Sequence, residues 1–323
     1  MKLTLFLSLL NCSGFLFGQG NQTEVRIHAV YGLSSEEVQM NSFIVSLPPL
    51  ITEIINSDYF QHAVLNTPME FKRPYLREEM TNKEILSSLL EAHEERFDIH
   101  CRSAGMEELD MIDTEDHVMD IVLEFMPAEE MKARNWSTMT AGFTPLGCPY
   151  IRVSKHHFNR YLDNNDSVAA SRMIIHEYMH TLYFNHETQE INRKDVPYAV
   201  EGIARETARW LRFSKEQPEA TGSWKWVYSV KNGQLISADD TDGSYEIELT
   251  EEGQIRFGHN GKVIKEEIAK AYYFSPNGQS YGFWNYLETT ERNGVELVFD
   301  GNKLRTDYFP EAYGVYNFFE KVE

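Results

Sequence analysis

The chain is organised around residues 173–182, which read Met-Ile-Ile-His-Glu-Tyr-Met-His-Thr-Leu. The apolar residues of this stretch, preceded by Asp166 or Ser167 as an N-cap, predict a buried helix. Residues four apart lie on the same face of a helix, so His176 and His180 can present two imidazole nitrogens to one ion. Because unpaired imidazoles are costly to bury, the pattern indicates a metal site.

Glu177 completes the pattern His-Glu-x-x-His. It points away from the two histidines by about one helical step, which suits a carboxylate that holds a water beside the ion. Zinc accepts nitrogen and oxygen donors, and a catalytic zinc site keeps one position open for water. Such a water ionises near neutral pH, and Glu177 can take its proton as general base. The motif predicts a metal-dependent peptidase, and the alternative is a core helix with two hydrogen-bonded histidines.

A third protein ligand is needed, and the first candidate is His186. It stands ten residues after His176, so this segment at first resembles the metzincin peptidases. That family has glycine at the position of Tyr183, where the chain turns toward the third ligand, and a methionine turn further on. A tyrosine resists the backbone angles that glycine allows, and no methionine follows Met179. We therefore expect a different third ligand, with His186 and Glu206 as fallbacks.

The preferred candidate is Glu201, on a second predicted helix. Asp195 can cap this helix, Pro197 suits its first turn, and apolar residues recur at helical spacing from Val200 to Leu211. A helix antiparallel to the first would carry Glu201 back to the two histidines. The alternative for Glu201 is a surface pair with Arg205, four positions on.

The two helices together resemble the gluzincin peptidases, which carry His-Glu-x-x-His and, about twenty residues later, Glu-Gly-x-Ala. The resemblance implies that His176, His180 and Glu201 bind zinc (Zn2+) and that Glu177 is the base. Gluzincins usually place a tyrosine or histidine further downstream to stabilise the oxyanion of the intermediate. The candidates left open for that role are Tyr198, Tyr272, Tyr273 and Tyr281.

The N-terminus predicts export. Residues 1–20 carry Lys2, an apolar run through Phe17 and then Gly-Gln-Gly, which is typical of a signal peptide and short for a membrane span. The mature protein is expected to be periplasmic, cell-surface or secreted, without a membrane span. Cys101 and Cys148 would remain after cleavage, and whether they pair is open. The formal charge of −20 argues against nucleic acid as a partner.

The length of 323 residues suggests two domains and an α+β fold. Residues 21–213 are expected to form the metallopeptidase-like domain, a small sheet plus the active-site helices. Its predicted elements are strands at 24–32, 118–123 and 150–153, a helix at 49–65 and a capping box at 81–84. In zinc peptidases an edge strand near the zinc helix commonly pairs with the substrate, and residues 118–153 must supply that strand.

The composition changes after Phe213. Residues 214–222 predict a linker, and 223–323 contain many Gly turns between short alternating runs, which is typical of an antiparallel β-barrel or sandwich. The opening Gly-Ser-Trp-Lys-Trp-Val at 222–227 and the aromatic closing segment at 316–322 resemble small lipocalin-like domains of exported proteins.

Two functional classes follow. The first is an exported zinc peptidase that acts on peptide or protein substrates. The second is a non-catalytic secreted binding protein that uses a peptidase-like scaffold and the lipocalin-like domain. Glu177 favours the first class, because a structural zinc site has no use for a base beside an open coordination position.

Overall fold

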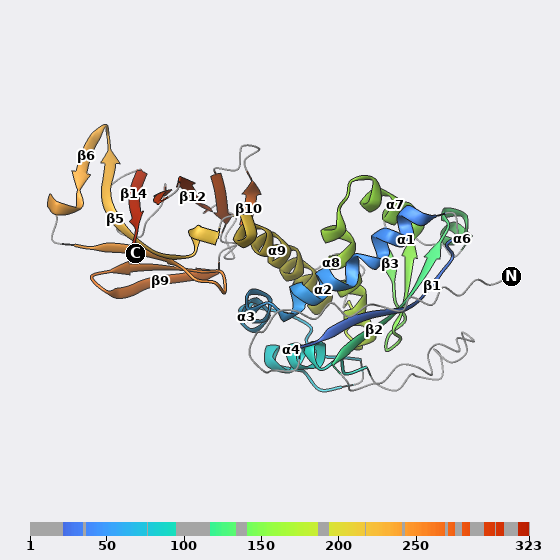
Figure 1. The fold of residues 1–323 in the computed structure, drawn as a ribbon. Coiled ribbons are helices and arrows are strands. Elements are labelled where there is room, and N and C mark those ends of the chain that lie inside the picture. The colour runs from blue at the N-terminus through green and yellow to red at the C-terminus, as the bar shows by residue number, and fades with distance from the viewer. Residues whose placement is uncertain are drawn as a thin grey trace. The chain divides into compact units, whose positions relative to one another are not determined.

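A computed structural model of the chain describes most of its residues (Figure 1). The described ranges are 22–34, 37–75, 77–94, 117–133, 141–186, 194–216, 218–240, 243–268, 271–274, 280–284, 294–300, 302–306 and 316–322. The predicted signal peptide, residues 1–20, and Cys101 lie outside them. Cys148 is buried and disulfide-bonded. The chain divides into two compact units, Met1–Arg205 and Glu206–Glu323.

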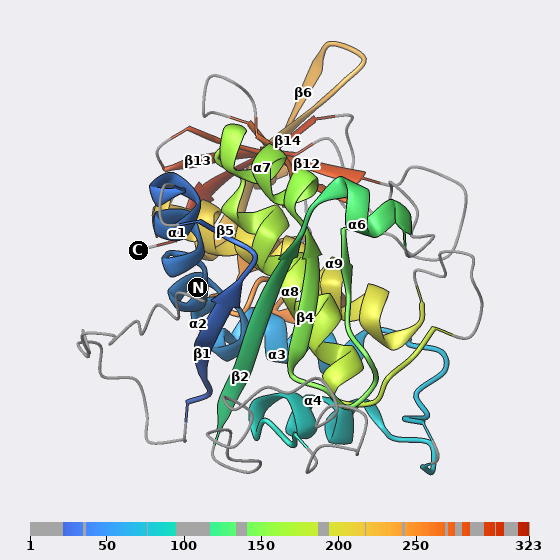
Figure 2. The same cartoon turned by 90° about the vertical axis from the view of Figure 1, so that its right-hand side faces the viewer.

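The first unit contains a mixed four-stranded sheet of order β1-β2-β4-β3. Strands β1 (Glu24–Tyr31), β2 (Val118–Met126) and β4 (Tyr150–Ser154) are parallel, and β3 (Gly142–Phe143) pairs antiparallel with β4. Figure 2 shows β1, β2 and β4 side by side. Nearly every residue of β2 is buried, as expected for a strand covered on both faces. The three predicted strands are confirmed, and within residues 118–153 strand β3 lies at the edge of the sheet.

The helices of this unit follow local sequence signals. Their bounds are α1 (Val38–Val45), α2 (Leu47–Asn56), α3 (Asp58–Asn66), α4 (Asn82–Leu90), α6 (Ala128–Ala133), α7 (Lys155–Asp163), α8 (Ser167–Thr181) and α9 (Val196–Glu216). Thr81 and Glu84 form the predicted capping box. The helical segment predicted at 49–65 is confirmed as α2 and α3. The two helices are separated at Ser57, because its backbone is extended and its side chain caps α3 by accepting from Phe60 N.

The segment Val38–Asn56 is long and apolar enough, by length and composition alone, to cross a membrane. In the structure it comprises two consecutive helices, α1 and α2. Helix α2 contacts α8 and β1, and Leu47, Ile51 and Ile54 are fully buried. These contacts are those of a core helix of the first unit.

Helix α8 is tied to the sheet by a buried polar network. Tyr178, in the middle of α8, donates its hydroxyl to Glu94 Oε1 at 2.5 Å. The same oxygen accepts the backbone N–H of Asp120 on β2 at 2.9 Å, and Asp120 Oδ1 lies 2.5 Å from His28 Nε2 on β1. The network fixes α8 against the two strands on the side of the helix that carries Tyr178.

Replacing Tyr178 by phenylalanine is expected to lower the free energy of unfolding by about 1–3 kcal/mol. The reason is that the buried Glu94 carboxylate loses one of its hydrogen-bond donors. Urea unfolding measures the change. The matched control is Tyr75→Phe, whose side chain is exposed and whose loss should stay within about 0.5 kcal/mol. Equal effects of the two substitutions would contradict the role of the network.

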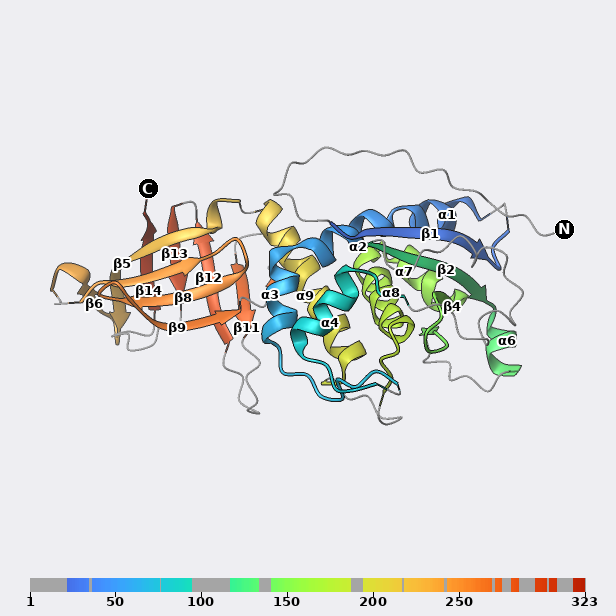
Figure 3. The same cartoon turned by 90° about the horizontal axis from the view of Figure 1, so that it is seen from below.

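The second unit contains a ten-stranded antiparallel sheet, β5 to β14 (Figure 3). The strands are β5 (Gly222–Lys231), β6 (Gln234–Ser237), β7 (Tyr245–Leu249), β8 (Gln254–His259), β9 (Lys262–Ile268), β10 (Ala271–Phe274), β11 (Ser280–Trp284), β12 (Gly294–Asp300), β13 (Lys303–Thr306) and β14 (Tyr316–Lys321). Their order is β10-β11-β12-β13-β14-β5-β7-β8-β9, with β6 also on β5. The overall class is therefore α+β, with a small mixed sheet and a separate antiparallel sheet.

The Asn-Gly turns of this sheet behave as their sequences predict. Asn232 and Gly233 join β5 to β6, and Asn260 and Gly261 join β8 to β9. All four residues have positive φ, between 50° and 77°, which is the conformation of a two-residue hairpin turn. These turns set the register of the strands on either side.

The boundary between the units differs from the predicted one. Helix α9 continues through Glu216, so the first residues of the predicted linker 214–222 are helical. The units separate at Arg205/Glu206, within this helix. The physical reason lies in the apolar residues of its last turns: Trp210 and Phe213 are buried, and the Phe213 ring packs 5.9 Å from Phe299 of β12.

Candidate metal centre

Helix α8 brings three predicted site residues into the interior of the first unit. Its N-cap is Asp166, whose side chain accepts the N–H of Ala169 as the sequence predicts. His176 and His180 are each 7% exposed, and their ring centroids lie 5.3 Å apart. Glu177, between them, is 5% exposed. The expected pairing of two imidazoles on one helix face is therefore present.

A sharp turn after α8 returns the chain to these two rings. Tyr183 has φ +69°, the left-handed conformation, and its N–H donates to the carbonyl of His180. The expectation that a tyrosine would resist this turn is wrong. Such a conformation costs about 1–3 kcal/mol and persists where the surroundings hold it. Here the Tyr183 ring packs so closely on Gly147 that a Cβ there would lie 2.2 Å from the ring.

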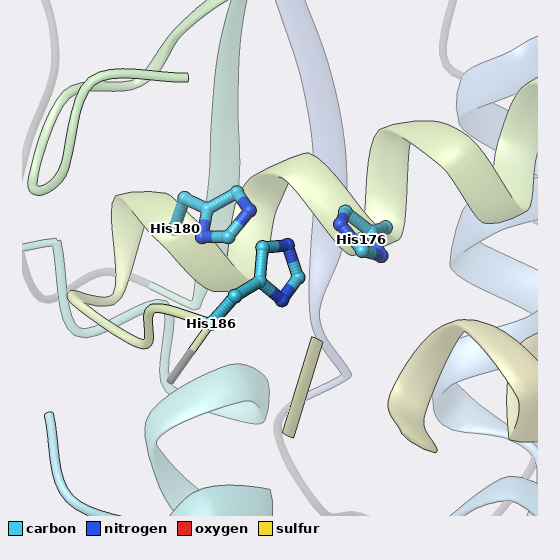
Figure 4. Close-up of side chains that lie close together, drawn as sticks. All are labelled: His176, His180 and His186. Atoms are coloured by element: carbon cyan, nitrogen blue, oxygen red, sulfur yellow. The ribbon is translucent and has the colours of Figure 1, made fainter. Parts of the chain in front are cut away.

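The turn places His186 against the two histidines of α8. One ligand atom from each of His176, His180 and His186 lies within 4.8 Å of the other two. Figure 4 shows the His186 ring reaching from the segment after α8 toward the rings on the helix. This is the residue that the sequence ranked as a fallback. These three side chains could hold a metal ion.

Each of the three histidines has an acceptor close to its Nδ1 atom. His180 Nδ1 lies 2.6 Å from the carbonyl oxygen of Phe184, and His186 Nδ1 lies 2.9 Å from Asp195 Oδ2. His176 Nδ1 lies 3.1 Å from Glu201 Oε2, without the alignment of a hydrogen bond. An acceptor at Nδ1 favours the tautomer whose Nε2 carries a free lone pair. The arrangement thus leaves the Nε2 atoms of His180 and His186 as donors to a metal, and it places a carboxylate beside Nδ1 of His176.

Glu201 lies beside His176, as expected if the second helix brings it back to the histidines of the first, and it is also near Arg172. Its Oε1 atom is 3.6 Å from Arg172 Nε. Burial raises the pKa of Glu201, but His176, Arg172 and Arg205 together lower it below its usual value. Glu201 is thus held as a carboxylate at the Nδ1 edge of His176. The other fallback, Glu206, is a buried residue of the second unit.

Glu177 occupies a buried position under strand β3. A Cβ atom at Gly142 would lie 2.7 Å from Glu177 Oε1 and 2.8 Å from its Cγ, so a side chain there would displace Glu177. Burial raises the pKa of Glu177, against the opposing effects of His176 and the Thr144 hydroxyl. Its Oε2 atom is buried without a hydrogen-bond partner in the described part of the chain. A carboxylate with a raised pKa and a free oxygen suits a proton acceptor.

Burial also disfavours a charged imidazole in this site. It lowers the pKa of His180 to about 3, helped by the neighbouring His176. A neutral imidazole is the form that binds a metal.

Tyr198, the first of the open oxyanion candidates, lies in the site. Its ring stacks on His186 with centroids 4.6 Å apart and lies at the same distance from His176. Burial raises its pKa, and so do the nearby carboxylates of Glu201 and Asp195. The other three candidates, Tyr272, Tyr273 and Tyr281, are on β10 and β11 of the second unit.

Three residues of the site were not singled out from the sequence: Arg172, Gly142 and Thr144. Arg172 lies one helical turn before His176, and that spacing could have revealed it. No sequence signal marks Gly142 or Thr144, because Gly142 lies on the two-residue strand β3 and Thr144 in the irregular segment that follows it.

Asp195 has two separable roles, and Asp195→Asn is expected to remove only one. An asparagine can still cap α9, because Oδ1 can accept the N–H of Tyr198 as it does now. It loses the charge that faces His186, so zinc affinity should fall about 10- to 100-fold. Competition with a chromogenic chelator measures this, and thermal unfolding of the metal-free protein should be unchanged. Asp195→Ala should lose both the helix cap and the charge beside His186. An unchanged zinc affinity in both variants would contradict the role of Asp195 at His186.

Comparisons of the chain with protein-family models, with curated proteins and with solved structures found no match. The geometry of the site is therefore the basis for inferring a function.

Proposed function

We propose that the protein is an exported zinc-dependent peptidase. In this proposal His176, His180 and His186 hold the ion through their Nε2 atoms, and the neighbouring Glu177 is the general base. The observation that carries the proposal is that each of the three imidazoles has an acceptor at Nδ1, while a buried carboxylate stands next to them. Three imidazoles are the donor set of a catalytic zinc site.

The proposal replaces Glu201 with His186 as the third ligand. Glu201 faces the Nδ1 edge of His176, and a carboxylate at that place orients a ligating imidazole and raises its basicity. Arg172 in turn keeps Glu201 charged. The role that the gluzincin resemblance implies for Glu201 is thus changed from ligand to partner of a ligand.

A zinc ion held there would supply a Lewis acid that polarises a substrate carbonyl and lowers the pKa of a water molecule. The chain's own residues supply the rest. Glu177, buried and with a free oxygen, accepts the proton of the attacking water and returns it to the leaving amine. Tyr198 holds its hydroxyl-bearing ring against two of the ligand rings, where it can stabilise developing negative charge.

A peptide substrate is supported by strand β3. It stands at the edge of its sheet and next to Glu177, and an extended chain that added to this edge would do so by main-chain hydrogen bonds. Phe143 of this strand is 41% exposed, although it is a large apolar residue. A peptide bond of such a chain would lie next to the base.

The remaining parts of the proposal concern export and the second unit. Export is proposed from residues 1–20, and the lipocalin-like barrel or sandwich is proposed as the form of the second unit's antiparallel sheet. That sheet would serve to bind substrate or a surface outside the cell. N-terminal sequencing of the protein recovered from the producing cells tests the cleavage.

The decisive experiment combines metal analysis with a peptidase assay of the full-length protein. We expect about one zinc per chain, cleavage of a mixture of unstructured peptides, loss of cleavage after chelation, and recovery on adding zinc. Bound zinc without cleavage would favour a non-catalytic binding protein. Absence of metal binding would reject both the peptidase and the proposed centre.

A further inference from the structure

Strand β3 and the residue that follows it lie against the proposed catalytic base. Gly142 is so close to Glu177 that any side chain there would collide with the carboxylate and with the sulfur of Met173, at 2.7 and 2.8 Å. The backbone of β3 is held in place by its pairing with β4. One side of the Glu177 carboxylate therefore rests on a fixed surface, which restricts the side chain to few rotamers.

Two buried polar atoms beside this contact lack partners. Thr144 is 4% exposed, and its hydroxyl has no hydrogen-bond partner in the described part of the chain. Glu177 Oε2 is likewise buried without a hydrogen-bond partner in the described part of the chain. Gly142, two residues before Thr144, contacts the same carboxylate, and the Thr144 hydroxyl lies within reach of it. A donor and an acceptor that are both buried and unpaired are each costly unless they satisfy one another.

We propose that Gly142 and Thr144 are positioning residues that hold Glu177 in its catalytic orientation, Gly142 by close contact and Thr144 by donating a hydrogen bond to the carboxylate. This inference rests on the proposed function, because it assigns the two residues to the base of that reaction. It also gives strand β3 a second role. The strand that would receive the substrate also aligns the base. The substrate and the Glu177 carboxylate would then both be positioned by the same rigid strand.

Kinetics of the zinc-loaded full-length protein test the inference. Thr144→Val keeps the shape and removes the donor, so kcat should fall about 10- to 100-fold while KM and zinc affinity are unchanged. Thr144→Ser keeps the donor and should restore kcat close to that of the original protein. Gly142→Ala should displace Glu177 and lower kcat about 100-fold. The matched control is Gly202→Ala on α9, where an added Cβ meets nothing within 4 Å.

A double-mutant cycle tests the contact without using activity. Unfolding constants are measured for the original protein, Thr144→Val, Glu177→Ala and the double variant. We expect the combined effect to differ from the product of the single effects by about threefold or more. Multiplicative effects, or an unchanged kcat in Thr144→Val, would overturn the inference. An original protein that cleaves no peptide would instead reject the proposed function, and the cycle would still decide the contact.

Discussion

Replacing Glu177 by glutamine is expected to lower kcat/KM for peptide hydrolysis about 10²- to 10⁴-fold while zinc stays bound. Glutamine has nearly the same shape as glutamate but cannot accept the proton of the attacking water. The three imidazoles that are proposed to hold the ion are untouched, so metal content and zinc affinity should not change. Steady-state kinetics and metal analysis of the same preparation measure both quantities.

The matched control is Glu79→Gln, the same chemical change at an exposed position of the first unit. It should leave kcat/KM unchanged. Full activity of the Glu177→Gln variant would reject Glu177 as the base. A parallel loss of zinc would mean that Glu177 belongs to the ligands, and the proposed division of roles would then be wrong.

The second large effect separates the two candidates for the third ligand. His186→Ala removes a proposed donor and should lower zinc affinity by more than about 100-fold, beyond the 10- to 100-fold that the loss of a ligand's partner costs. Glu201→Gln removes the charge at His176 Nδ1 and should fall within that smaller range. Chelator competition at constant pH ranks the two variants.

The opposite ranking would restore the ligand role that the sequence motif predicts for Glu201. Circular dichroism of both variants should match that of the original protein, since neither side chain belongs to the network that fixes α8 to the sheet. If the ranking is the opposite one, the three-histidine centre is abandoned. Glu177 as base and the peptidase proposal would still stand on the other measurements.

Local features of the chain were predictable from the sequence. The N-cap Asp166, the capping box at Thr81 and the Asn-Gly turns at 232 and 260 depend on neighbours a few residues away. The helical spacing of His176 and His180 is of the same kind, because the period of a helix decides which side chains share a face. The α+β class follows from such periodicities as well.

Only the tertiary structure decided which distant groups meet this helix. Tyr183 adopts a left-handed conformation because it packs on Gly147, and that turn brings His186 to the histidines. Likewise, pairing of β3 with β4 places Gly142 on Glu177. The sequence by itself determined the elements and the pair of imidazoles, since these depend on local backbone preferences. The third imidazole and the setting of the base depend on contacts between segments far apart in the chain, whose energies no local pattern records.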